Sequence, residues 1–310
     1  MRDPRELFIE HAPAQVPPGS VLVYAFTGFV DAGHGVRLTA QHILATCEHR
    51  LVATFDPDEL LDYRARRPAM QYVVDHFVSV DIPQVTLHEV IDAQGRPFLL
   101  LHGPEPDYQW QRFMAAVDLI IDRYQVGMAV GLTSMPWPVP HTRPLGMTLH
   151  GSEPEILAGF TSQVGEIEVP GHVPAMLEFH LAQGGLPSMG ITAQVPHYLV
   201  QFEYPRAVLT IIHGLEHVAA VRIPLGDLEE TAAGADRDVA AQVEGNAEIA
   251  VVISALEEQY DQQGVRAGAA ASGLGDLADE PMPTGDEIAA QLEQFLSSLD
   301  DPNDPGKQVG

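Results

Sequence analysis

Lysine, cysteine and long apolar runs are scarce or missing in this sequence of 310 residues. No apolar run approaches the ~20 residues that a helix needs to span a bilayer. The first residues, MRDPRELFIEHAPAQVPPGS, contain acids and prolines where a secretory signal needs an apolar core. We therefore expect a cytoplasmic protein without a membrane-spanning segment.

The single cysteine, Cys47, excludes an internal disulfide. It lies in the amphipathic stretch VRLTAQHILATCEHR, where a buried structural thiol is the simpler interpretation. No His or Asn partner for a catalytic thiol is recognisable beside it. We expect Cys47 to serve packing.

Basic residues are few, with 16 Lys and Arg against 43 Asp and Glu, and the formal net charge is −27. Such a charge repels phosphate backbones, so nucleic acid and anionic membranes are poor partner candidates. Residues 227–310 hold 19 acidic and 3 basic residues, a net charge of −16, and the first 226 residues hold −11. The C-terminal part is therefore expected to be physically distinct from the body.

Strand-like and helix-like segments alternate after Ser20, a pattern typical of an α/β fold with a mostly parallel sheet and helices on both faces. The expected strands are 20–26, 51–55, 84–91, 98–103, 126–132, 146–151 and 190–196. The expected helices are 34–48, 107–124, 173–183 and 205–221, and Asp107 is expected to cap the second of these.

The chain divides by composition into five parts. An α/β core domain is predicted over residues 1–225, because the alternating pattern ends there. After it we expect an acidic helical hairpin, a flexible linker rich in small residues, a C-terminal helix and a disordered tail, at residues 226–263, 264–285, 286–299 and 300–310.

Two ligand-binding motifs are incomplete. The loop after the first strand has Gly28 and Gly33 but places Val30 where a dinucleotide-binding loop needs its middle glycine, and the valine side chain obstructs the pyrophosphate. His213-Gly-Leu-Glu216-His217 matches the inverted zinc-peptidase pattern, but that motif also needs a downstream carboxylate. We therefore predict no cofactor and no metal, and keep His213 and His217 as a minor alternative.

Nucleophile motifs are also incomplete. No G-x-S-x-G elbow is present, and Ser134 follows a predicted strand near His141. Three prolines, at positions 136, 138 and 140, instead favour a rigid extended loop that shapes a surface.

The basic cluster of Arg64, Arg66 and Arg67 gives a more specific signal. Fifteen of the sixteen basic residues are arginine, a side chain whose planar fork suits carboxylates and phosphates and is common in protein interfaces. Acids of its own chain, acids of a neighbouring subunit and an anionic substrate all fit the cluster, and we prefer subunit contact because no catalytic partner is evident. Arg143 belongs to the same class of candidates.

Several stretches together resemble the proteasome assembly chaperone family, named after the second eukaryotic assembly chaperone, in its actinobacterial branch of uncharacterised members. These stretches are DPDELLDYRARRP (56–68), GLTSMPWPVPHTRP (131–144), the segment from VPGHVPAMLEF to EYPRAVLTII (169–212) and the end piece ALEEQYD to GDEIAAQLEQFL. The likeness spans the chain from about Arg2 to Leu296.

The resemblance implies a three-layer α/β/α sandwich similar to nucleoside phosphorylases, without established catalytic residues. It also implies homo-oligomers, with a trimer as a candidate arrangement for bacterial members, and proteasome subunits as candidate partners. The chain ends in Gln308-Val309-Gly310, not in the hydrophobic-Tyr-any motif of proteasome activators, so insertion of its tail into a proteasome pocket is not expected.

Two functions stay open on this evidence. The first is a non-catalytic, protein-binding homo-oligomer whose loops 27–34, 56–68 and 133–144 lie near the carboxyl ends of the strands. The second is a binder or hydrolase of a small nucleoside- or phosphate-type molecule in the crevice at those strand ends. The candidate crevice residues are Asp31, His34, Trp137, His141, His197 and Tyr198.

Overall fold

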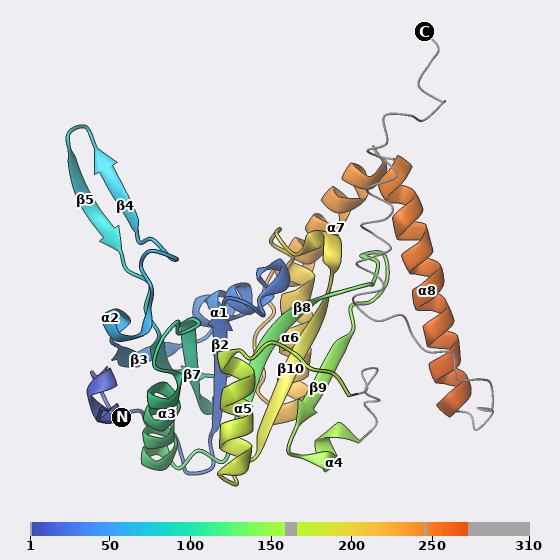
Figure 1. The fold of residues 1–310 in the computed structure, drawn as a ribbon. Coiled ribbons are helices and arrows are strands. Elements are labelled where there is room, and N and C mark those ends of the chain that lie inside the picture. The colour runs from blue at the N-terminus through green and yellow to red at the C-terminus, as the bar shows by residue number, and fades with distance from the viewer. Residues whose placement is uncertain (1, 159–165, 245–246, 272–310) are drawn as a thin grey trace. The chain divides into compact units, whose positions relative to one another are not determined.

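A computed structural model describes residues 2–158, 166–244 and 247–271. The chain divides into two units, Met1–Asp261 and Gln262–Gly310. The first unit holds a central sheet with helices on both faces (Figure 1). Of the second unit the structure describes residues 262–271, which form the end of a helix. The predicted C-terminal helix and tail, 286–310, lie outside the described residues.

The central sheet has eight strands in the order β1-β3-β6-β7-β2-β8-β10-β9. Their bounds are β1 (Phe8–Glu10), β2 (Val21–Thr27), β3 (His49–Phe55), β6 (Thr86–Ile91), β7 (Pro97–Pro104), β8 (Met128–Trp137), β9 (Met147–Gly151) and β10 (Ser188–Pro196). The four central strands β7, β2, β8 and β10 pair in parallel, and the outer strands pair antiparallel. The predicted α/β class is confirmed, with the parallel pairing confined to the centre of the sheet.

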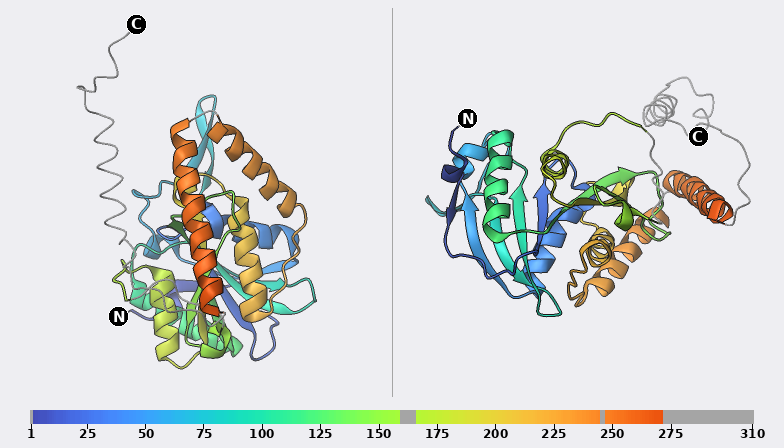
Figure 2. Two further views of the ribbon diagram at one scale, coloured as in Figure 1. Left: turned by 90° about the vertical axis from the view of Figure 1, so that its right-hand side faces the viewer. Right: turned by 90° about the horizontal axis from the view of Figure 1, so that it is seen from below.

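Helices cover both faces of this sheet. Their bounds are α1 (Gly35–Thr46), α2 (Pro57–Leu60), α3 (Trp110–Tyr124), α4 (Pro154–Leu157), α5 (Val173–Gln183), α6 (Pro205–Ala219), α7 (Leu228–Glu244) and α8 (Ala247–Ala271). Helices α1 and α6 cover one face, and α3 and α5 cover the other (Figure 2). Among the described residues, no helix is long and apolar enough to cross a membrane.

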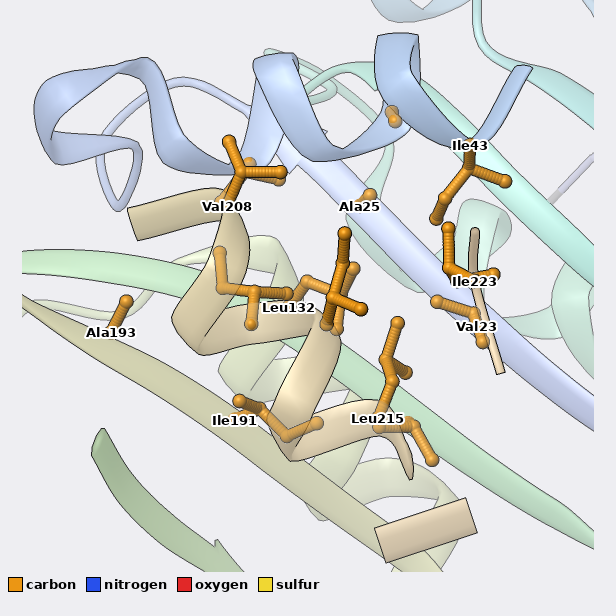
Figure 3. Packing of buried hydrophobic residues seen from close by; sticks show 14 of the residues in the cluster. Val23, Ala25, Ile43, Leu132, Ile191, Ala193, Val208, Leu215 and Ile223 are labelled. Carbon is orange, nitrogen blue, oxygen red and sulfur yellow. The ribbon is translucent and has the colours of Figure 1, made fainter. Parts of the chain in front are cut away.

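Each face of the sheet contributes to a separate hydrophobic core. On the α1–α6 face, alternate residues of β2, β8 and β10, among them Val23, Leu132 and Ile191, form one core with residues of the two helices (Figure 3). Strand β10 is buried along its whole length, which explains its continuous apolar and small-residue sequence. Alternation of side chains between two covered faces therefore fixes the register of the central strands.

A glycine in α6 sets how closely that helix approaches the sheet. A Cβ atom at Gly214 would lie 2.7 Å from the Ile191 side chain on β10. The helix-weakening glycine at this position, about 1 kcal/mol less favourable than alanine, thus has a packing reason. Gly214 fills a variable position of the H-x-x-E-H pattern and faces the sheet.

Three local features differ from the sequence expectations. Asp107 does not cap α3, because Gln109 occupies the cap position and the Asp107 carboxylate instead accepts the backbone N–H of Asp62 at 2.7 Å. Helix α8 continues to Ala271, beyond residue 263 where the hairpin was expected to end. An additional hairpin, β4 (Ala69–Val73) and β5 (His76–Asp81), lies in a segment for which no strand was predicted.

Candidate functional site

The carboxyl ends of the parallel strands gather the predicted crevice loops at one end of the sheet. Strand β2 leads into the loop that contains Asp31, β8 ends at Trp137, and β10 leads directly into His197 and Tyr198. The register places Trp137 opposite Pro196. The parallel centre of the sheet therefore brings three sequence-distant loops together, as a doubly wound sheet does at its ligand-binding edge.

The Asp31 carboxylate lies at the N-terminus of helix α1. Its Oδ1 atom accepts the backbone N–H of Val36 at 2.8 Å and that of Arg37 at 3.3 Å. Burial raises the pKa of Asp31, and these two hydrogen bonds partly oppose that rise. The N–H groups that a phosphate would use at a helix N-terminus are thus occupied by a side chain of the protein itself.

Ser134 is packed and hydrogen-bonded. Its side chain is fully buried and its hydroxyl donates to the backbone carbonyl of Ala32 at 2.8 Å. Gly35, at the start of α1, leaves room for it, because a Cβ there would lie 3.1 Å from the serine hydroxyl. The hydroxyl therefore joins the first loop to β8, and it has no hydrogen bond to His141.

His141 and Tyr198 form the centre of the predicted crevice. The Tyr198 hydroxyl accepts the backbone N–H of His141 at 2.7 Å and lies 2.9 Å from its Nδ1 atom. The His197 ring contacts Tyr198 edge-on and donates a hydrogen bond to the backbone of Trp137. Four of the six candidate crevice residues thus meet, whereas Asp31 caps α1 and the charge of His34 interacts with Asp31 and Glu203.

Burial determines the protonation states in this cluster. It lowers the pKa of His141 and raises the pKa of Tyr198 to about 12, so both side chains are neutral near pH 7. If the Tyr198 hydroxyl donates to Nδ1, Nε2 of His141 carries the ring proton. That Nε2 atom is buried and has no hydrogen-bond partner among the described residues.

Two acidic helices are tied to the residues around the crevice. Arg143 donates to Asp261 on α8 through Nε at 2.9 Å and through a terminal nitrogen at 2.8 Å, and it also pairs with Glu257 at 3.2 Å. Arg206 on α6 forms an ion pair with Asp236 on α7. Arg143, predicted as an interface or anion-binding residue, thus has both its acids within its own chain.

The three arginines of the loop after β3 have different surroundings. Arg66 donates to the backbone carbonyl of Glu105 and pairs with Asp107 at 3.2 Å, so it holds its own loop together. Arg64 and Arg67 are exposed, and neither forms a salt bridge with any residue that the structure describes. These two side chains stay candidates for contact with another molecule.

The H-x-x-E-H segment lies on the outer side of α6. His213 and His217 are exposed, and Glu216 pairs with Arg222 at 2.7 Å. Within residues 2–158, 166–244 and 247–271, no group of three or more His, Cys, Asp or Glu side chains is arranged to hold a metal ion.

The β4–β5 hairpin, which we call the arm, is the feature that the sequence reasoning missed. Every residue from Ala69 to Ile82 is exposed, yet many of these residues are apolar and large. The arm exposes Met70, Tyr72, Val73, Val74, Phe77, Val78, Val80 and Ile82. Figure 1 shows it extending away from the sheet. The alternation of polar and apolar residues in QYVVDHFVSV could have indicated two strands. Both faces of the arm are exposed, however, so no buried apolar face distinguishes them.

Comparisons with known proteins agree with this fold. A protein of unknown function from Mycobacterium tuberculosis shares 43% identity, with a TM-score of 0.80, covering 83% of this chain and 91% of that chain. One of unknown function from Corynebacterium glutamicum shares 36%, with a TM-score of 0.79, covering 83% and 98%. A proteasome-assembly chaperone homologue from M. tuberculosis shares 25%, with a TM-score of 0.70, covering 75% and 99%.

The search of curated proteins gave no match. The sequence model of one family, described as the PAC2 family, matches residues 25–243. These residues contain the sheet from the end of β2 onward, the helices on both of its faces and the crevice loops. The chain therefore belongs to the PAC2 family.

Proposed function

We propose that this protein is a homo-oligomeric, protein-binding protein that acts in the manner of a proteasome-assembly chaperone. The observation that carries the proposal is the exposed apolar arm. An isolated two-stranded hairpin is at best marginally stable in water. Phe77 is 62% exposed and Val74 is 90% exposed, and the arm adds no residue to either hydrophobic core.

The apolar surface of the arm favours a second copy of this chain as its occupant. Large contiguous apolar patches on soluble proteins mark interfaces, because burying them removes apolar area from water. An edge-on ring contact between Tyr72 and Phe77, with centroids 5.1 Å apart, keeps two of these side chains together on the arm. A paired aromatic cluster of this kind is a typical interface anchor.

Charge also favours self-association. Arg64 and Arg67 precede the arm and have no acid of their own chain within salt-bridge distance among the described residues. Helices α7 and α8 supply acidic residues such as Glu229, Glu230 and Glu258. In an oligomer the arginines of one copy would face the acidic surface of the next, which orients the contact more than it adds affinity.

The finer part of the proposal concerns the client. One relative with 25% identity is described as a proteasome-assembly chaperone homologue, and an archaeal proteasome activator from Pyrococcus furiosus, 10% identical, shares the fold alone. Proteasome subunits are therefore the first clients to test. The acidic helices α7 and α8 are the part of this chain that we expect to contact them.

The oligomer is tested by placing charge on the arm. The double variant Tyr72→Glu/Phe77→Glu should convert the wild-type oligomer into a monomer in size-exclusion chromatography with light scattering. Its melting temperature should change little beyond the loss of association, because neither residue packs in a core.

Phe179→Glu is the matched control, because Phe179 is an aromatic residue on α5 with 68% exposure, similar to that of Phe77. It should leave the mass unchanged. A monomeric wild-type protein, or an arm variant with the wild-type mass, would refute the proposal.

The crevice at the strand ends stays a prediction. The Nε2 atom of His141 is a buried polar atom without a hydrogen-bond partner among the described residues, which a polar group of a ligand could satisfy. If no ligand binds in the crevice, the oligomer proposal still stands, because the arm and the crevice share no residue.

A further inference from the structure

Helices α1 and α6 do not reach across the whole of their face of the sheet. Among the described residues, none from β1 or β3 and only Val90 from β6 belongs to the core on that face. The opposite side of the same strands is buried, because Val52, Phe55 and Leu87 belong to the core that α3 completes. Strands β1, β3 and most of β6 are therefore covered on one side only.

The strand register shows which residues share the uncovered side, because residues directly opposite each other on paired strands point to the same face. We call them the open face: Ile9, Thr54, Thr86 and His102 in one row, and Leu51 and His88 in the next. His88 lies opposite Leu100, which faces the α1–α6 core. The two rows are in contact, since ring nitrogens of His88 and His102 are 3.3 Å apart.

The open face meets solvent and is uncharged. Ile9 is 69% exposed and Leu51 is 38% exposed. Burial and the charge of neighbouring histidines hold the pKa of His88 and His102 at about 4, so both rings are neutral near pH 7. None of the six residues carries a carboxylate, although the chain has 43 acidic residues. A second, equally acidic copy can therefore approach this surface without local repulsion.

The arm has an apolar face of its own. Its register sets Met70 opposite Val80 and Tyr72 opposite Phe77, so these four uncharged side chains share one face. Each pair on the other face includes a polar residue. The arm does not cover the open face of its own chain, because residues 69–82 are all exposed and the arm extends away from the sheet (Figure 1).

We propose that the apolar face of the arm of one copy packs on the open face of a second copy, against Ile9 and Leu51. Sheets pack face to face through apolar side chains, and a two-stranded ribbon on a bare sheet face is a small case of this packing. The arm lies between β3 and β6 in the chain, next to the face that receives it. Two copies related by a two-fold axis can each give an arm and receive one. This inference rests on the proposed oligomer and adds the surface that holds the arm.

Crosslinking between two cysteine variants of the full chain tests the contact. One copy carries Val80→Cys on the arm and the other carries Leu51→Cys on the open face, and the two are co-expressed with different affinity tags and purified through both. A short bis-maleimide should join position 80 of one copy to position 51 of the other, as located by peptide mass spectrometry. The native Cys47 is buried, so the wild-type protein is the blank.

Phe179→Cys in place of Leu51→Cys is the matched control, because Phe179 is an exposed apolar residue on α5 and lies outside the open face. It should give no link to position 80.

A charge on the open face gives a second test. Leu51→Glu should convert the oligomer into a monomer in size-exclusion chromatography with light scattering, without disturbing either core, since Leu51 belongs to neither. It should also abolish hydrogen-exchange protection in residues 69–81, which are exposed within their own chain. Leu51→Val should keep both the mass and the protection.

The outcomes distinguish this contact from the oligomer itself. A link between position 80 and position 51 of different copies, together with monomeric Leu51→Glu, supports the contact. If the wild type is an oligomer but position 80 links only to position 80 of another copy, to Phe179→Cys or to nothing, the contact is overturned and the oligomer stands. A link formed within one chain of the dilute double variant Leu51→Cys/Val80→Cys, without a link between copies, also overturns it. A monomeric wild type refutes both proposals.

Discussion

At the scale of single residues, sequence and structure agree where the partner of a side chain can be inferred from strand order. His141, His197 and Tyr198 follow strands that the apolar pattern marked, so their meeting at one end of the sheet was predictable. The roles of Arg66 and Arg143 were not, because their acids, such as Asp261, belong to segments whose placement no local pattern reveals. Residue type indicated which interactions each side chain can form, and the fold determined which residue it contacts.

A histidine pair gives a pH prediction at this scale. His88 on β6 and His102 on β7 have ring nitrogens 3.3 Å apart. Burial, together with the charge of neighbouring histidines, lowers the pKa of each to about 4 from 6.5. The unfolded chain therefore binds protons at these residues between pH 6.5 and 4 while the folded chain does not, and acid within this window stabilises the unfolded state.

The free energy of unfolding should consequently fall as the pH drops from 6.5 to 4, by up to ~1.4 kcal/mol per pH unit for each histidine. Urea unfolding at several pH values measures this slope. The double variant His88→Gln/His102→Gln should flatten it, and His213→Gln, an exposed position on α6, should not. An unchanged slope in the double variant would show that the pair does not couple folding to protonation.

At the scale of elements, the core strands and helices were predictable because each buries an apolar stripe. Helix α5 has the predicted bounds, and β10 and α6 differ from prediction only at their ends. The arm was missed because it has no buried face to impose a pattern. The predicted helix cap at Asp107 was wrong, because the Asp107 carboxylate accepts a long-range hydrogen bond from the backbone N–H of Asp62.

Helix α8 gives a prediction at this scale. Arg143 joins the loop after β8 to Asp261 and Glu257. Arg143→Met should speed hydrogen exchange in residues 249–261 while changing the free energy of unfolding little, because exposed ion pairs contribute little to stability. Arg237→Met, at an exposed arginine of α7 without a salt bridge among the described residues, is the control. Equal exchange in both variants would show that Arg143 does not hold α8.

At the scale of the whole molecule, composition and alternation predicted the α/β class, and the structure adds the order of the strands. The outer strands pair antiparallel, which no local pattern distinguished from parallel pairing. Because helices cover both faces of the sheet, the core buries its apolar residues without another chain. The arm, in contrast, has no partner within the described part of the chain. The central claim is that a second copy provides this partner.

Hydrogen exchange of the arm tests that claim most directly. If residues 69–81 pack against another copy, their amides should be protected at high protein concentration and should lose protection on dilution, with the core strands unaffected. The variant Tyr72→Glu/Phe77→Glu should show fast exchange in the arm at every concentration. Fast exchange of the wild-type arm at all concentrations would contradict the account, because the arm would then have no partner in solution.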